Sequence, residues 1–197
     1  WLEVGDPGLA PDDLAHVVWS ADTLATGTEH VGIVDVVVGN PPFLSPLRGA
    51  PPADPDPDWA APLGAYADHA ALFLAWAHHR VGPDGGRVLL VQPASVLAGR
   101  DTAGIRELVD SAGELAGLWL DTDGAFPAAV TATAPLLVRG RRHDEVRLWK
   151  GRGVVPVSPS SAAAGTPARC GRVATRAWSD HAAAILGLPD PHLPEGA

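Results

Sequence analysis

Val34-Asp-Val-Val-Val-Gly-Asn-Pro-Pro-Phe43 joins a run of β-branched residues to a turn that contains two consecutive prolines. From Ile33 to Val38 the only polar residue is Asp35. A continuous Val/Ile run of this length is typical of a strand that is buried on both faces of a parallel sheet. The prolines cannot continue the ladder of hydrogen bonds. The stretch therefore predicts a buried strand with Asn40 to Phe43 at its carboxyl end.

The residues after this strand alternate between helical and strand patterns. Tyr66 to Val81 predicts a helix with one apolar face, and Asp101 predicts the cap of a second helix that ends at about Ser111. Leu44 to Leu63, which is rich in Pro, Asp and Ala, predicts a loop. Further strands are predicted at 87–92, 115–120, 131–138 and 146–149.

This order predicts an α/β fold with a mostly parallel sheet, because strands that alternate with helices form doubly wound sheets. A polar turn at 139–144 joins the last two predicted strands, so we expect an antiparallel C-terminal strand or hairpin. In such sheets, ligands bind beyond the carboxyl ends of the strands. Asn40 to Phe43 lies at one of these ends.

The composition is that of one soluble globular domain, with 197 residues, 46% apolar and 19% charged. The longest helical apolar run, Ala70 to Ala77, is far shorter than the roughly 20 residues of a membrane span. No signal-peptide pattern is present. Cys170 is the single cysteine, which excludes intrachain disulfides and cysteine-based zinc sites. We therefore expect a cytoplasmic protein without a metal site.

The net charge of −9 argues against duplex DNA binding by this chain alone, because Lys and Arg supply most non-specific DNA affinity. One local basic cluster stands out against this charge, and two interpretations of it are open: a solvated hairpin edge or a DNA contact. Its members are Arg139, Arg141, Arg142, Arg147, Lys150 and Arg152.

Asn40-Pro-Pro-Phe43 has the groups that a pocket for a planar amine needs. An amine on an aromatic ring is a poor nucleophile, and acceptors for both of its N–H groups draw the nitrogen toward tetrahedral geometry. The Asn40 side-chain oxygen and the Pro41 carbonyl are two such acceptors, which the rigid prolines would place for in-line attack. Phe43 offers a ring on which a base flipped out of a duplex can stack. Alternatively, Asn-Pro-Pro only turns the chain.

The segment resembles motif IV of the amino-methyltransferases, Asn-Pro-Pro-Tyr/Phe, and its surroundings resemble the N-6 adenine DNA methylases of restriction-modification systems. In that family, a strand with a terminal acid precedes the motif, as Val17-Val-Trp-Ser-Ala-Asp22 does here. A Gly-Gly turn leads into a strand that ends in proline, as from Gly85 to Pro93, and a Phe-centred segment follows, as from Gly124 to Val138. The resemblance covers about residues 15 to 150, and only the motif itself is highly specific.

The resemblance implies a partial Rossmann-like methyltransferase fold with S-adenosylmethionine as the methyl donor. The implied catalytic residues are Asn40, Pro41, Pro42 and Phe43; the implied cofactor contacts are Asp22, Thr23 and Asn40; the implied contacts of the target base are Phe43 and Phe126. Asp22 fits a loop acid or a helix cap equally well, and Phe126 also fits a plain core residue.

Four further residues are implied around the pocket. Pro93 and Ser95 would shape the end of the neighbouring strand. Tyr66 and Asp68 would line the pocket mouth, although solvated residues at the start of a helix are the simpler interpretation.

The implied function is transfer of a methyl group to the N6 amine of a flipped adenine in DNA, together with a specificity or nuclease subunit or domain. Two alternatives stay open: N-methylation of a protein glutamine or of a guanine in ribosomal RNA, and a non-catalytic fragment that serves as a binding subunit. The family's glycine-rich cofactor loop would lie before residue 15, where it is absent, and the chain has no Met. We therefore expect residues 1–150 to be the C-terminal, catalytic part of a methyltransferase domain. Residues 151–197 would be a linker and the start of a following segment.

Overall fold

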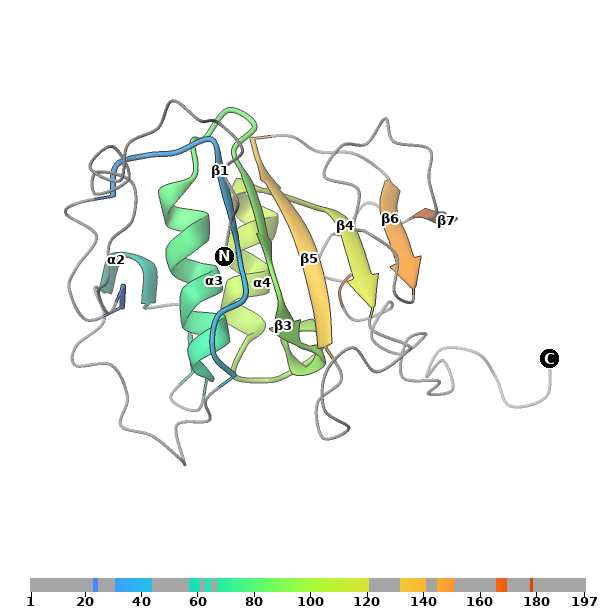
Figure 1. Ribbon diagram of the computed structural model, residues 1–197, viewed down its shortest axis with the longest axis horizontal. Coiled ribbons are helices and arrows are strands. Elements are labelled where there is room, and N and C mark those ends of the chain that lie inside the picture. Colours follow the sequence, from blue (N-terminus) through green and yellow to red (C-terminus); the bar gives the residue numbers. More distant parts are fainter. Residues whose placement is uncertain are drawn as a thin grey trace, which may run out of the picture.

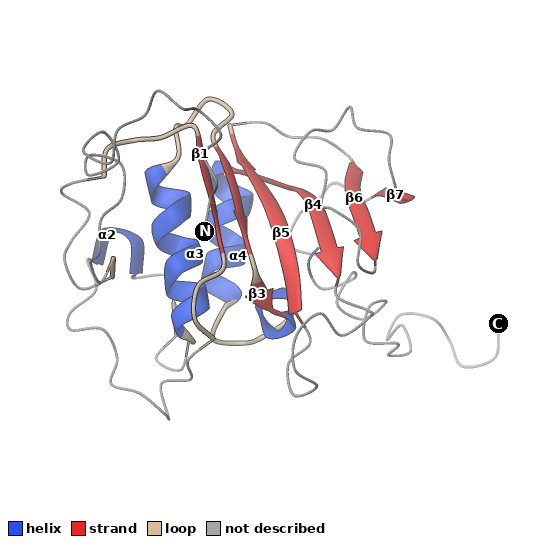
Figure 2. Ribbon diagram, in the orientation of Figure 1, coloured by secondary structure: helices blue, strands red, loops and turns tan. Residues whose placement is uncertain are grey.

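The computed structural model describes residues 23–24, 31–43, 57–60, 63–64, 67–120, 132–140, 145–150, 166–169 and 178. They form a sheet with two long helices packed on one face (Figures 1 and 2). The strands are β1 Val36–Gly39, β2 Arg87–Leu90, β3 Gln92–Pro93, β4 Gly113–Leu120, β5 Ala132–Arg139, β6 Glu145–Lys150 and β7 Thr166–Arg169. The helices are α2 Pro57–Ala60, α3 His69–Arg80 and α4 Ala103–Ala112, with a 3-10 turn, η2, at Ala94–Leu97.

The sheet has the order β1-β2-β5-β4-β6-β7, and β3 also pairs with β5. β1 is parallel to β2, and β4 is parallel to β6. β5 is antiparallel to both of its main neighbours, β2 and β4, and β7 is antiparallel to β6. Consequently β1, β2, β4 and β6 all run in one direction. The predicted α/β fold with a mostly parallel sheet and an antiparallel strand near the C-terminus is confirmed.

β5 and β6 do not form a hairpin, so that form of the prediction is wrong. β5 lies between β2 and β4, and β6 pairs with β4 on its other side. The reason is burial: residues 132–138 are all buried, which favours a central strand with a neighbour on each edge. β6 therefore lies on the far side of β4 from β5.

β1 is parallel to β2 as predicted, but the expected burial on both faces is wrong. Ile33, Val36 and Val38 are 62%, 43% and 63% exposed. α3 and α4 cover only one face of the sheet, and on that face Val34 and Val37 pack against the core. β1 is also the edge strand of the described sheet.

α3 confirms the predicted helix, with a start three residues later than Tyr66. The Asp68 carboxylate accepts a hydrogen bond of 2.8 Å from the Ala71 N–H and caps the helix. The apolar spacing does mark the core face, because Ala70, Leu74 and Ala77 are fully buried. The helix ends at Arg80, ahead of Gly82-Pro83.

α4 confirms the second helix, but Asp101 does not cap it. The cap position is Thr102, and its hydroxyl turns back toward carbonyls of the preceding loop. Asp101 is held through its main chain, where its carbonyl accepts a hydrogen bond from the Gly64 N–H at 3.0 Å.

Two segments predicted to lack regular structure contain short elements. α2 interrupts the predicted loop from Leu44 to Leu63, and its Trp59 is 2% exposed in the core. β7 lies in the predicted linker and pairs with β6. Trp178, which lies in the same predicted linker and following segment, is helical and fully buried in the same core as Trp59. The predicted domain boundary after residue 150 stays a prediction.

Candidate functional site

Asn40 is the first residue beyond β1, at its carboxyl end. The parallel ladder extends to Gly39, whose carbonyl accepts a hydrogen bond of 3.0 Å from the Val91 N–H beyond the end of β2. A side chain at position 39 would meet Leu90, since a Cβ there would lie 3.2 Å from Leu90 Cδ2. The neighbouring strand thus fixes the main chain immediately before Asn40.

The turn from Asn40 to Phe43 alternates between exposure and burial. Asn40 and Pro42 are exposed, Pro41 is buried and Phe43 is half-buried. Neither the Asn40 amide nor the Pro41 carbonyl forms a hydrogen bond with another residue that the structure describes. Two hydrogen-bond acceptors are therefore available at the end of β1, beside a half-buried aromatic ring.

Gln92 is a polar residue at this end that the sequence analysis did not single out. It is fully buried, its Nε2 donates to the Val91 carbonyl at 3.1 Å, and its Oε1 has no partner among the described residues. In the ladder it stands opposite Thr133 of β5. A buried amide oxygen without a donor costs about 1–3 kcal/mol. The signal in the sequence was a glutamine at the end of the apolar run that begins at Val88.

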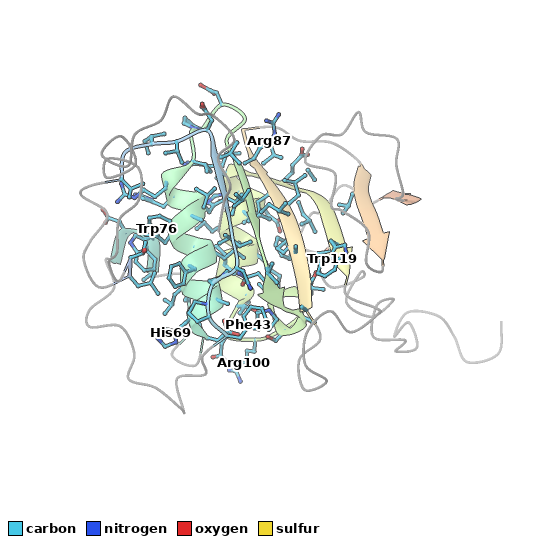
Figure 3. The ribbon with its side chains drawn as sticks, viewed as in Figure 1. Phe43, His69, Trp76, Arg87, Arg100 and Trp119 are labelled. Atoms are coloured by element: carbon cyan, nitrogen blue, oxygen red, sulfur yellow. The ribbon has the colours of Figure 1, made fainter. Side chains whose placement is uncertain are left out.

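The loop after β3 also lies at this end of the sheet. Pro93 closes β3 and precedes η2. The Ser95 side chain is exposed, while its carbonyl accepts hydrogen bonds within the loop. Figure 3 shows Phe43, His69 and Arg100 at one end of the molecule and Arg87 at the opposite end.

Asp68, one of the two residues expected at a pocket mouth, is the cap of α3. Burial raises the pKa of its carboxyl, and the hydrogen bond from the Ala71 N–H opposes that rise. The simpler interpretation, a residue at the start of a helix, therefore accounts for Asp68. Tyr66 lies outside the described residues.

The expected cofactor contacts are only partly within the described residues. Thr23 is half-buried in a turn, and the next residue, Leu24, packs in the hydrophobic core at 4% exposure. Asp22 lies outside the described residues, and so does Phe126, the second expected base contact. The hydroxyl of Thr23 and the amide of Asn40 are polar groups that suit the ribose and amino-acid parts of S-adenosylmethionine. These two residues thus fit the cofactor by the chemistry of their polar groups. Among the described residues, Asn40 to Phe43 are the only predicted site residues that lie together in one turn.

The basic cluster is divided by the fold. Arg139 is structural: its Nη1 donates to the carbonyls of Val81 at 2.8 Å and His78 at 3.4 Å. Arg147 and Lys150 lie in β6, and the other three arginines lie outside the described residues. Of the two interpretations, a solvated edge does not hold for Arg139.

No helix in the described ranges is long and apolar enough to span a membrane. No group of three or more His, Cys, Asp or Glu side chains in them is arranged to hold a metal ion.

No family model matches the sequence, and no curated protein does. Several solved structures are similar to the chain. A type I restriction-modification methyltransferase subunit from Streptococcus thermophilus is 23% identical, with a TM-score of 0.48 over 66% of this chain and 29% of that chain. The M protein of the type I restriction enzyme EcoKI is 20% identical, with a TM-score of 0.47 over 66% of this chain and 28% of that chain.

A protein from Listeria monocytogenes, assigned to the class I S-adenosylmethionine-dependent methyltransferases, is 18% identical. Its TM-score is 0.48 over 62% of this chain and 38% of that chain. The chain thus spans less than two fifths of the length of each of these three structures. Identities of 18–23% with TM-scores of 0.47 and 0.48 are too low to decide what the chain does.

Proposed function

We propose that this chain is the catalytic part of an S-adenosylmethionine-dependent methyltransferase that acts on the N6 amine of adenine in DNA, as part of a restriction-modification system. The observation that carries the proposal is the turn from Asn40 to Phe43. It lies at the carboxyl end of parallel strand β1, with an exposed amide and a buried proline carbonyl that have no described hydrogen-bond partner.

In this proposal, a flipped adenine enters the turn with its amino group between two acceptors. One N–H donates to the Asn40 side-chain oxygen and the other to the Pro41 carbonyl, which draws the nitrogen lone pair out of conjugation with the ring. The half-buried Phe43 supplies a ring face against which the base stacks. Two rigid prolines hold both acceptors in place, so little reorganisation is needed when the amine reacts.

The methyl donor supplies an electrophilic methyl group when it is bound. Thr23 and Asn40 are the described residues whose polar groups would contact it, together with Asp22. An amide oxygen and a peptide carbonyl orient N–H groups but are too weakly basic to keep a proton. The proton that the amine loses therefore passes to water on the exposed side of Asn40.

A methyl-transfer assay with tritiated S-adenosylmethionine tests this function. We expect label in a single DNA strand that contains adenine and none in a strand in which the adenine is replaced by purine, which has no 6-amino group. N40A removes one acceptor, and the loss of one such group costs about 10²–10³ in kcat. E107Q, a change at an exposed position of α4, is the matched control and keeps the wild-type rate.

The alternatives give different results in the same assay. If label appears in a protein glutamine or in ribosomal RNA and none appears in DNA, the proposed substrate is wrong. The assignment of the turn as an amine pocket would still stand. An N40A variant that methylates adenine at the wild-type rate would contradict the role of the turn itself.

A further inference from the structure

Residues 94–101 form a loop between β3 and α4 that is clamped from the inside by a buried arginine. Arg106 is 9% exposed. Its Nη1 donates to the Val96 carbonyl at 2.9 Å and to the Thr102 hydroxyl at 2.8 Å, and its Nη2 donates to the Gly99 carbonyl at 2.9 Å. Hydrogen bonds from a charged donor are roughly twice as strong as those between neutral groups. The guanidinium therefore ties both halves of the loop to the first turns of α4.

Thr102 and Gly99 complete the clamp. The Thr102 hydroxyl lies 3.0 Å from the Gly99 carbonyl and 3.3 Å from the Ser95 carbonyl. The Gly99 N–H also donates to the Ser95 carbonyl, at 2.6 Å. A Cβ at position 99 would approach that same carbonyl to 2.6 Å, so the loop closes only around a glycine. The main chain on both sides of position 100 is thus held in one conformation.

The clamp determines what Arg100 presents to solvent. The Gly99 carbonyl points inward to Arg106, and in a trans peptide the next N–H points the opposite way. The Arg100 N–H therefore points away from Arg106, and among the described residues it has no acceptor. Arg100 itself is exposed. The loop thus presents an exposed guanidinium from a main chain that is held in place.

The loop lies at the same end of the sheet as the proposed base pocket. Gln92 and Pro93 continue the line of β2 directly into the loop, and Val91 is bonded to Gly39, one residue before Asn40. Figure 3 places Phe43 and Arg100 at this end, with the Arg100 side chain projecting outward. The exposed cation and the proposed pocket therefore lie at one end of the sheet.

We propose that Arg100, held by the Arg106–Thr102 clamp, binds a phosphodiester group of the nucleic-acid strand that carries the target base. This inference rests on the proposed function and adds a backbone contact to the base pocket. Arginine side chains and main-chain N–H groups are the groups that proteins use to fix a strand by its phosphates. The net charge of −9 repels phosphates overall, so a preorganised cation at the same end of the sheet as the pocket restricts where the strand can lie.

A salt titration of strand binding tests the inference. The probe is a fluorescein-labelled single strand of thymidines with one central adenine, and the readout is fluorescence anisotropy at ionic strengths between about 50 and 200 mM. Loss of one phosphate contact on a single strand reduces the slope of log K against log salt by about 0.7. We expect this reduction, with weaker binding, for R100Q, and the wild-type slope for R100K, which keeps the charge. R87Q, at the opposite end of the molecule, is the matched control and keeps both slope and affinity.

Two results would overturn the inference: a wild-type slope in R100Q, or a wild-type protein that does not bind the strand even at the lowest salt. A different outcome of the same titration tests the proposed function. N40A is expected to keep the wild-type slope and to lose the preference for the strand with adenine over one of thymidines alone. If the wild-type protein lacks that preference but R100Q still changes the slope, the phosphate contact is supported and the adenine pocket is contradicted.

Discussion

At the scale of single residues, His78 is buried in α3, and its ring Nε2 has no hydrogen-bond partner among the residues that the structure describes. Burial and the nearby charge of Arg139 lower its pKa from 6.5 to about 4. Between pH 6.5 and about 4 the unfolded chain therefore binds a proton that the folded chain does not bind. The contribution of His78 to stability is fully present above pH 6.5 and falls as the pH drops through this window.

H78Q keeps a polar side chain but removes this titration. We expect the free energy of unfolding of the wild type to fall more steeply than that of H78Q as the pH drops from 6.5 toward 4, by about 1 kcal/mol for each pH unit. Urea unfolding at a series of pH values measures this difference. V38T, at an exposed position and without an ionisable group, is the control and should keep the wild-type slope. Parallel slopes in wild type and H78Q would show that the ring is not held neutral by the fold.

The candidate site was predictable from sequence only where its residues are contiguous. Asn40 to Phe43 form one short motif after a strand, so pattern and chemistry both point to them. Gln92 and Arg106 stand out because they are polar and buried. The burial of Gln92 depends on β5, and that of Arg106 depends on the loop before α4. No local pattern contains that information. Asp101 shows the converse: a good local cap signal was outweighed by Thr102 and by the contact with Gly64.

At the scale of elements, periodicity located the longer helices and strands within a few residues, but it missed α2 and β7 and did not show which strands are neighbours. The strand prediction at 131–138 matches β5, yet its place between β2 and β4 follows from which faces are buried together. β1 shows the same limit. Its Val/Ile run was correctly assigned to a parallel strand, but an apolar run does not reveal that α3 and α4 pack on one face only.

Threonine substitutions in β1 test this one-sided burial. Val37 packs against the core, whereas Val38 is 63% exposed. Threonine keeps the branched Cβ, so the two changes differ mainly in whether a hydroxyl is buried. We expect V37T to lower the free energy of unfolding by about 1–3 kcal/mol and V38T to change it by less than about 0.5 kcal/mol. Equal losses in urea unfolding would mean that both faces of β1 are covered, as the Val/Ile run alone predicted.

At the scale of the whole molecule, the core joins segments that the sequence analysis kept apart. Trp59 of α2 and Trp178 are 2% and 0% exposed and belong to one cluster with Leu74 of α3 and Val88 of β2. Trp178 lies beyond the domain boundary predicted after residue 150, and β7, also beyond it, extends the sheet from β6. A composition rich in Ser, Pro and Ala predicts a linker, but one buried tryptophan supplies more contact area than many small residues.

This packing makes W178A a test of where the folded unit ends. A buried tryptophan replaced by alanine costs about 3–5 kcal/mol, so we expect a loss of this size in urea unfolding, similar to that for W59A. E107Q serves again as the exposed control and should unfold like the wild type. A chain that ends at residue 150 lacks both Trp178 and β7, and we expect it to lose at least as much stability as W178A. If that shortened chain instead unfolds at the wild-type urea concentration, residues 151–197 are a linker and a separate segment, and the boundary inferred from composition is correct.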